Sequence, residues 1–193
     1  MTARSAWWLG VVGAVGVLAG CGRRSPEPTG PGGTEAGTLT VRSTAFPAGK
    51  AIPPKHTADG EDVSPALSWA GLPAETKELA MICDDPDAPR AQAWVHWVIY
   101  KIPADANALP EGVAQTDAPA APAGAMQGKN DFGHVGYGGP APPRGHGVHH
   151  YHFTLYALDA ALDLQPGLTK KQLLAAMEGH VLAEGEVVGT YQR

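Results

Sequence analysis

The chain has 193 residues, of which 44% are hydrophobic, and its 19 acidic side chains outnumber its 14 basic ones, giving a net charge of −5. From Thr38 onward the excess is larger, with 17 acidic against 11 basic side chains. A protein that binds nucleic acid needs clustered positive charge to neutralise phosphates. This sequence has no basic stripe, so nucleic acid is excluded as an expected partner.

The first twenty residues have the features of an export signal. Arg4 gives a positive end, and the apolar run over residues 6–17 is too short for a membrane span. The ending Leu18-Ala19-Gly20-Cys21 is similar to the bacterial lipoprotein signal, in which the cysteine is lipidated. We therefore predict a signal peptide over residues 1–20, lipidation of Cys21 and anchoring in the bacterial cell envelope. The alternative is an ordinary secretory peptide with an incidental cysteine, and it also exports the protein.

The next segment changes composition. Residues 22–37 are rich in glycine and proline and carry almost nothing apolar, so residues 21–37 are predicted to form a flexible tether that begins at the lipidated cysteine. Residues 38–193 suffice for one domain with a single core. Cys83 lies in an apolar run and is expected to be a buried, unpaired side chain.

Five segments predict strands. Residues 38–44 alternate with period two, as in a half-buried strand. Residues 78–83 and 94–102 are nearly continuous apolar runs, typical of strands buried on both faces. Residues 149–158 and 186–191 complete the set, although Gly189 weakens the last segment as a strand.

One helix is predicted from Lys170 to about Leu182, with Thr169 as its cap and with Leu173, Leu174 and Met177 on one face. A second short helix is expected near Ala104. The glycine- and proline-rich residues 112–147 predict a long ordered loop, and such loops are usually functional. The fold class is therefore mainly β (α+β), with peripheral helices.

Three polar segments, residues 84–89, 94–97 and 138–151, are predicted to form one pocket. Carboxylates and imidazoles are costly to bury, so their position beside apolar strands indicates binding or catalysis. An aspartate such as Asp85 or Asp87 can accept an imidazole N–H and fix the tautomer of that ring. Each segment also has a purely structural interpretation. Residues 84–89 would form an Asp-Pro turn, His96 would be a hydrogen-bonded core histidine, and residues 138–147 would form a surface loop without a ligand.

Strand alternation places His149 and Tyr151 on one face of their strand and His150 and His152 on the other. The same rule places His96 with Tyr100 and its neighbours at even positions. The spacing of His150 and His152 also fits a metal pair. No third ligand accompanies them, so we expect two solvent-facing histidines and no metal site.

The ordered set of motifs resembles the phosphatidylethanolamine-binding protein family, in particular its bacterial branch akin to Raf kinase inhibitor proteins. The matching segments are residues 51–53, 60–69, 85–89, 94–97, 139–151 and 155–159. The resemblance implies a large central sheet packed on a smaller one, with few peripheral helices. It also implies a small pocket for phosphate-like anions.

Carried over position by position, the resemblance implies a pocket lined by Asp85, Asp87, His96, Pro143, His149 and Tyr151. Gly139 and Pro142 would lie in the supporting loop. The sequence departs from the family at His150, where arginine is common, so a titratable group replaces a permanent cation.

We therefore expect an envelope-anchored protein that binds a small phosphorylated or anionic ligand, without a cofactor and without turnover. The alternative is a hydrolase or metal-dependent enzyme that uses the same aspartates and histidines. A third possibility is an envelope scaffold in which the pocket is dispensable. Whether the ligand is consumed discriminates the first two.

Overall fold

The computed structural model describes residues 38–193. The predicted signal peptide, Cys21 and the linker lie outside these residues. The described part holds eight strands, one short 3₁₀ helix and one α-helix: β1 (Thr40–Ser43), η1 (Pro54–His56), β2 (Leu67–Ala70), β3 (Glu78–Asp85), β4 (Trp94–Pro103), β5 (Ala108–Leu109), β6 (Met126–Gln127), β7 (His149–Leu158), α1 (Lys170–Met177) and β8 (Val181–Tyr191).

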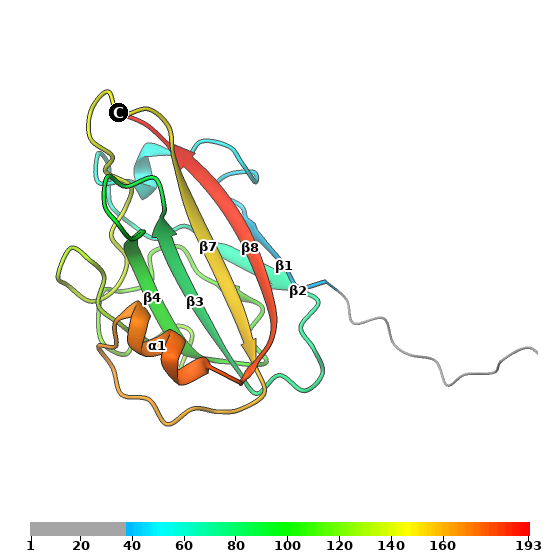
Figure 1. Cartoon of the computed structure of the whole chain (residues 1–193). Coiled ribbons are helices and arrows are strands. Elements are labelled where there is room, and N and C mark those ends of the chain that lie inside the picture. The colour runs from blue at the N-terminus through cyan, green and yellow to red at the C-terminus, as the bar shows by residue number, and fades with distance from the viewer. Residues whose placement is uncertain (1–37) are drawn as a thin grey trace, which may run out of the picture. The chain divides into compact units, whose positions relative to one another are not determined.

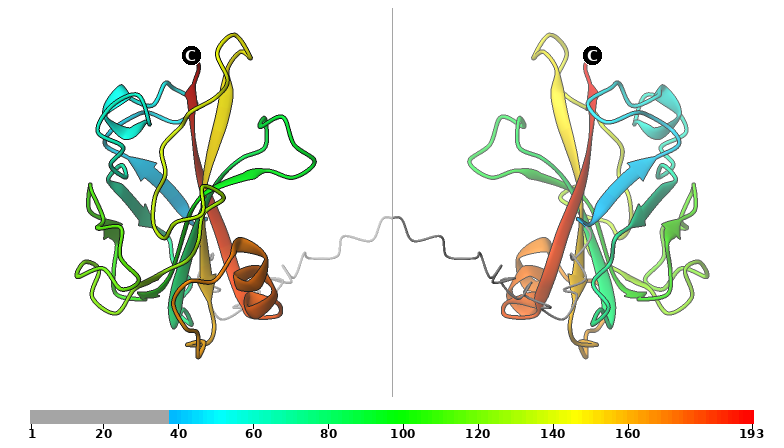
Figure 2. Two further views of the ribbon diagram at one scale, coloured as in Figure 1. Left: turned by 90° about the vertical axis from the view of Figure 1, so that its left-hand side faces the viewer. Right: turned by 90° about the vertical axis from the view of Figure 1, so that its right-hand side faces the viewer.

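The strands form two antiparallel sheets (Figure 1). The larger has the order β6-β4-β3-β7-β8, and the smaller has the order β1-β2-β5. In Figure 2 the large sheet stands between the small sheet on one face and α1 on the other. The predicted fold class is confirmed, with a large sheet packed on a smaller one and helices at the periphery.

The central strands β3 and β4 are buried on both faces, as their continuous apolar runs predict. One face packs toward the small sheet through a cluster that includes Met81, Trp97 and Phe153. The other packs toward α1 through a cluster that includes Ile82 and Leu173. Fully burying an aliphatic or aromatic side chain of this size stabilises the fold by about 1.5–3 kcal/mol.

The predicted helix begins as expected but ends early. Thr169 caps α1 through a capping box with Gln172, and Leu173 and Met177 are buried, whereas Leu174 is exposed. The helix stops at Met177 because Gly179 adopts a positive φ of 81° and β8 begins at Val181. No helix within residues 38–193 has the length and apolarity that a membrane span requires.

The second predicted helix is absent. Around Ala104 the chain makes a turn in which the Ala106 N–H donates to the Pro103 carbonyl at 3.0 Å, and β5 follows. The loop over residues 112–147 is confirmed as mostly irregular, interrupted by the short strand β6. Cys83 is buried and unpaired, as expected, and burial raises the pKa of its thiol well above the ordinary value.

Gly189 has a packing role in β8, which explains a glycine in that strand. The N–H of Ile52 donates to the Thr190 carbonyl at 2.7 Å, so residues 49–52 run along the edge of β8. A Cβ at position 189 would lie 2.5 Å from Cγ1 of Ile52 and 2.8 Å from the ring of Phe46. These side chains therefore need the space that glycine leaves.

We predict that Gly189→Val lowers the free energy of unfolding by about 1–3 kcal/mol, because the added methyls overpack this contact. Urea denaturation measures the change. Glu184→Ala, at an exposed position of the same strand, should change stability by less than about 0.5 kcal/mol. Equal effects of the two substitutions would show that the space at Gly189 is not needed.

Candidate functional site

A cavity of about 240 Å³ lies where β3 ends and β4 and β7 begin. In Figure 1 the β3–β4 loop and the loop before β7 lie at the same end of the large sheet as the C-terminus. Six of the eight predicted site residues line the cavity: Asp85, His96, Pro142, Pro143, His149 and Tyr151. Asp87 and Gly139 are not among its lining residues.

A buried hydrogen bond between Asp85 and His149 forms the base of the site. His149 donates from Nδ1 to Oδ2 of Asp85 at 2.7 Å, and the backbone N–H of Asp87 donates to Oδ1 at 2.9 Å. Both side chains of the pair are almost fully buried. The register Asp84↔His152 brings the end of β3 beside the start of β7, so the antiparallel pairing itself creates this contact.

The second nitrogen of His149 meets another imidazole. Its Nε2 lies 2.8 Å from Nδ1 of His146, so Asp85, His149 and His146 form a continuous chain of hydrogen bonds. His146 is exposed, and it sits between Gly145 and Gly147, both with positive φ. Sequence reasoning missed His146. The signal was a histidine flanked by two glycines three residues before the predicted pocket histidine.

A β-bulge places His96 in the cavity. Cys83 pairs with Trp97 and Asp84 pairs with Val95, which leaves His96 as the extra residue of β4. Val95 accordingly packs with the cluster near α1, while the His96 ring contacts Tyr151 edge-on at 5.0 Å between centroids. The expectation that His96 shares a strand face with Tyr100 is therefore wrong, because a bulge breaks the period-two alternation.

The buried His96 ring presents an acceptor rather than a charge. Its Nδ1 donates to the Gly138 carbonyl at 2.6 Å. Burial lowers the pKa of His96, so the neutral form is favoured. With the proton on Nδ1, Nε2 carries a lone pair and can accept a hydrogen bond from a ligand.

Tyr151 supplies the complementary group. Its hydroxyl is buried near the Asp85 carboxylate and makes no well-aligned hydrogen bond within residues 38–193. Burial and the nearby Asp85 carboxylate raise the pKa of Tyr151 far above its ordinary value, so the hydroxyl keeps its proton. A buried polar group without a well-aligned partner costs about 1–3 kcal/mol.

Asp87 also pairs with a histidine, but outside the cavity. Its Oδ2 accepts from the backbone N–H of His150 at 2.8 Å and from His150 Nδ1 at 2.7 Å. These bonds lower the pKa of Asp87. His152 instead pairs with Glu186 at 2.8 Å, so the two histidines bind separate carboxylates. Within residues 38–193 no group of three or more His, Cys, Asp or Glu side chains is arranged to hold a metal ion.

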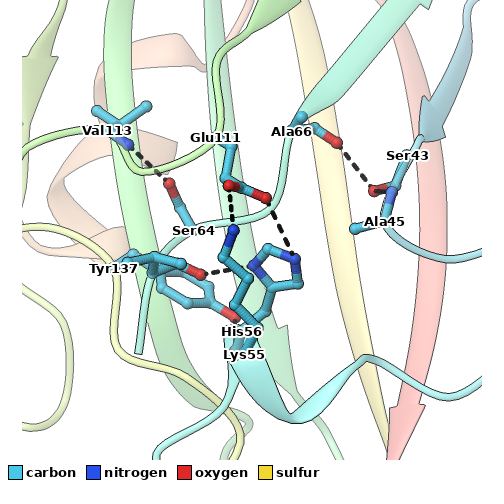
Figure 3. A network of polar contacts seen from close by, with 10 residues as sticks. Ser43, Ala45, Lys55, His56, Ser64, Ala66, Glu111, Val113 and Tyr137 are labelled. Carbon is cyan, nitrogen blue, oxygen red and sulfur yellow. Dashed lines mark hydrogen bonds and ion pairs between the residues drawn. The ribbon is translucent and has the colours of Figure 1, made fainter. Parts of the chain in front are cut away.

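Gly139 fixes the loop behind the site. Its N–H donates to Oδ1 of Asp62 at 2.6 Å, and a Cβ there would lie 2.7 Å from the Cα of Thr57, so the close approach requires glycine. Figure 3 shows the adjoining network, in which the Tyr137 hydroxyl donates to the His56 carbonyl at 2.7 Å. This frame holds residues 137–139 against η1.

Arg90 is a second residue that sequence reasoning missed. Its guanidinium carbon lies 4.2 Å from the centroid of the Trp94 ring, in a cation–π contact, and both residues line the cavity. Phe132 also lines it and contacts Trp94 and His96 edge-on. Arg90 follows a proline-rich turn, and nothing in that local pattern distinguishes it from a solvated arginine.

Comparison with known proteins decides the family. The model of the family described as phosphatidylethanolamine-binding protein matches residues 42–192. The chain belongs to the phosphatidylethanolamine-binding protein family. A relative from Methanothermobacter thermautotrophicus, named UPF0098 protein, is 52% identical over 155 residues, which cover 80% of this chain and 99% of that protein.

Two solved structures of the phosphatidylethanolamine-binding protein family share the fold closely. E. coli YBCL is 32% identical with a TM-score of 0.76, and the match covers 80% of this chain and 98% of that one. The homolog CT736 from Chlamydia trachomatis is 39% identical with a TM-score of 0.73, over 81% and 99% of the two chains. The family has bacterial and archaeal members that span nearly the whole described domain.

In this family member, the low pKa of His96 predicts a pH effect. The unfolded chain binds a proton at this imidazole near the ordinary value of 6.5, whereas the folded protein does not. Above that pH, the His96 imidazole is neutral in both states and does not lower the free energy of unfolding. The free energy of unfolding then declines as the pH falls toward the folded-state pKa. The free energy of unfolding, measured between about pH 8 and pH 5, should decline less in His96→Gln than in the wild type.

His180→Gln is the matched control for this titration, because His180 pairs with Asp159 at the surface, outside the cavity. It should keep the wild-type decline. An unchanged decline in His96→Gln would contradict the neutral assignment of His96.

Proposed function

We propose that this protein binds a small phosphorylated or otherwise anionic ligand in the cavity and does not turn it over. The observation that carries the proposal is the Tyr151 hydroxyl, a buried donor without a well-aligned protein partner in a cavity of ligand size. Native proteins rarely leave such a group unsatisfied, so a ligand atom is the natural partner.

The polar groups left free by the protein define the ligand. Tyr151 offers an O–H donor, His96 offers an acceptor at Nε2, and Arg90 offers a permanent positive charge. A phosphate that keeps one proton, or a phosphate that carries an amine nearby, satisfies all three. The name of the family, which refers to phosphatidylethanolamine, supports the same ligand chemistry.

An acid/base enzyme is the second candidate, because the chain from Asp85 through His149 to His146 resembles an oriented general base. In the structure, however, His149 Nε2 contacts His146 and not an open position for substrate. The geometry therefore favours binding over hydrolysis. Consumption of the ligand would reverse that choice.

The tyrosine tests the proposal without disturbing the fold. Tyr151→Phe should weaken binding of inorganic phosphate and of phosphorylethanolamine by roughly 10- to 150-fold, since one hydrogen bond to a charged group is lost. It should leave the free energy of unfolding equal or higher, because the unpartnered hydroxyl disappears. Titration calorimetry and urea denaturation of the purified full-length protein measure both quantities.

Tyr156→Phe, on the opposite face of β7, is the control and should leave affinity unchanged. Equal affinity of wild type and Tyr151→Phe for both compounds would contradict the proposal. Zinc should be titrated in the same series as the two phosphate compounds, because zinc binding without phosphate binding would support the metal-dependent alternative. His149→Ala is a poorer probe, because it leaves the buried Asp85 without its imidazole partner.

We also propose that the domain is tethered to the cell envelope through lipidated Cys21. The support is the sequence Leu18-Ala19-Gly20-Cys21 after an apolar run, followed by a glycine- and proline-rich linker. An exported protein does not meet cytosolic kinases, so the predicted place in the Raf kinase inhibitor-like branch carries no kinase role here.

Cys21→Ser should abolish incorporation of a labelled fatty acid and move the protein from the membrane fraction to the soluble or unprocessed pool. Cys83→Ala removes the other cysteine, which is buried in the core, and should keep the label. Labelling of Cys21→Ser at the wild-type level would contradict the anchor.

A further inference from the structure

A larger groove lies directly beside the cavity. It encloses about 710 Å³ between the β3–β4 loop and the start of α1. Figure 2 shows that this loop projects on the same side of the large sheet as α1. The family match and the predicted pocket residues do not account for this groove.

The groove concentrates positive charge on an acidic domain. Arg90, Lys170 and Lys171 line it, against a single acidic lining residue, Asp131. One oxygen of Asp131 already accepts the backbone N–H of Val95 at 2.8 Å. Three of the eleven basic side chains beyond Thr38 thus gather at one hollow, in a domain with seventeen acidic side chains.

Two of these three basic side chains make no ion pair within the described residues. Lys170 pairs with Asp84, but neither Arg90 nor Lys171 has an ion-pair partner within residues 38–193. Thr169, which caps α1, also lines the groove, so the groove lies at the N-terminal end of this helix, where the helix dipole is positive. With Lys170 paired to Asp84 and Asp131 in the lining, the three basic side chains leave the groove with an excess of one positive charge.

The groove and the cavity share a wall. Arg90 and Trp94 line both, and the cation–π contact at 4.2 Å holds the guanidinium over the indole. The Arg90 guanidinium, which lies between the cavity and the groove, can attract a negative group in either of them. A single ligand with two anionic groups can therefore place one in the cavity and one in the groove.

We propose that this groove is a second anion subsite, and that the physiological ligand is a small molecule with two phosphate-like groups. The inference rests on the proposed function, since the first group occupies the cavity. The second group would contact Lys171, with Arg90 between the two. Joining two groups in one molecule makes the second contact intramolecular, which raises affinity without a larger interface.

Alkylene bisphosphonates of increasing chain length, compared with methylphosphonate, test the proposal. Titration calorimetry of the full-length protein should show an affinity maximum at one intermediate length, on the order of tenfold above methylphosphonate. Lys171→Gln should abolish that gain and leave the affinity for methylphosphonate unchanged. Lys77→Gln, an exposed lysine outside the groove, should keep the gain.

Two results would overturn the second-subsite inference and leave the proposed function of the cavity in place. They are an affinity that does not change with chain length, or a gain that survives in Lys171→Gln, while methylphosphonate still binds and is weakened by Tyr151→Phe. Failure of methylphosphonate to bind wild-type protein would overturn the cavity's proposed function and this inference with it.

Discussion

The site depends on one buried interaction, the hydrogen bond from His149 to Asp85. A carboxylate removed from water is tolerated only when donors replace the lost solvent, and here an imidazole and the Asp87 N–H do so. Removing one partner of such a pair typically costs about 3–5 kcal/mol. This pair therefore fixes the end of β3 against the start of β7, and the loops that surround the cavity follow from that position.

The same interaction decides which groups remain for a ligand. Both oxygens of Asp85 accept protein donors, and both nitrogens of His149 are engaged, so these two residues are structural supports. Tyr151, His96 and Arg90 are left to face the cavity. The Asp85 carboxylate at the base of the site therefore has both oxygens hydrogen-bonded by the protein, and the ligand contacts fall to the other side chains that line the cavity.

Much of the fold was predictable because strong local patterns agree with it. The apolar runs of β3 and β4, the alternation of β7 and the Thr169 cap all gave the right element in nearly the right place. The sequence could not show the bulge at His96, because an extra strand residue is defined only by its partner strand. It also could not show Arg90 at the site, because loop conformation, and not spacing, brings it there.

A crystal structure of the protein with inorganic phosphate would show directly whether the cavity binds an anion. We expect the anion within hydrogen-bond distance of Tyr151 Oη and His96 Nε2, with the Asp85–His149 hydrogen bond intact. Phosphate bound elsewhere, with the Tyr151 hydroxyl still unpartnered, would contradict anion binding at this site.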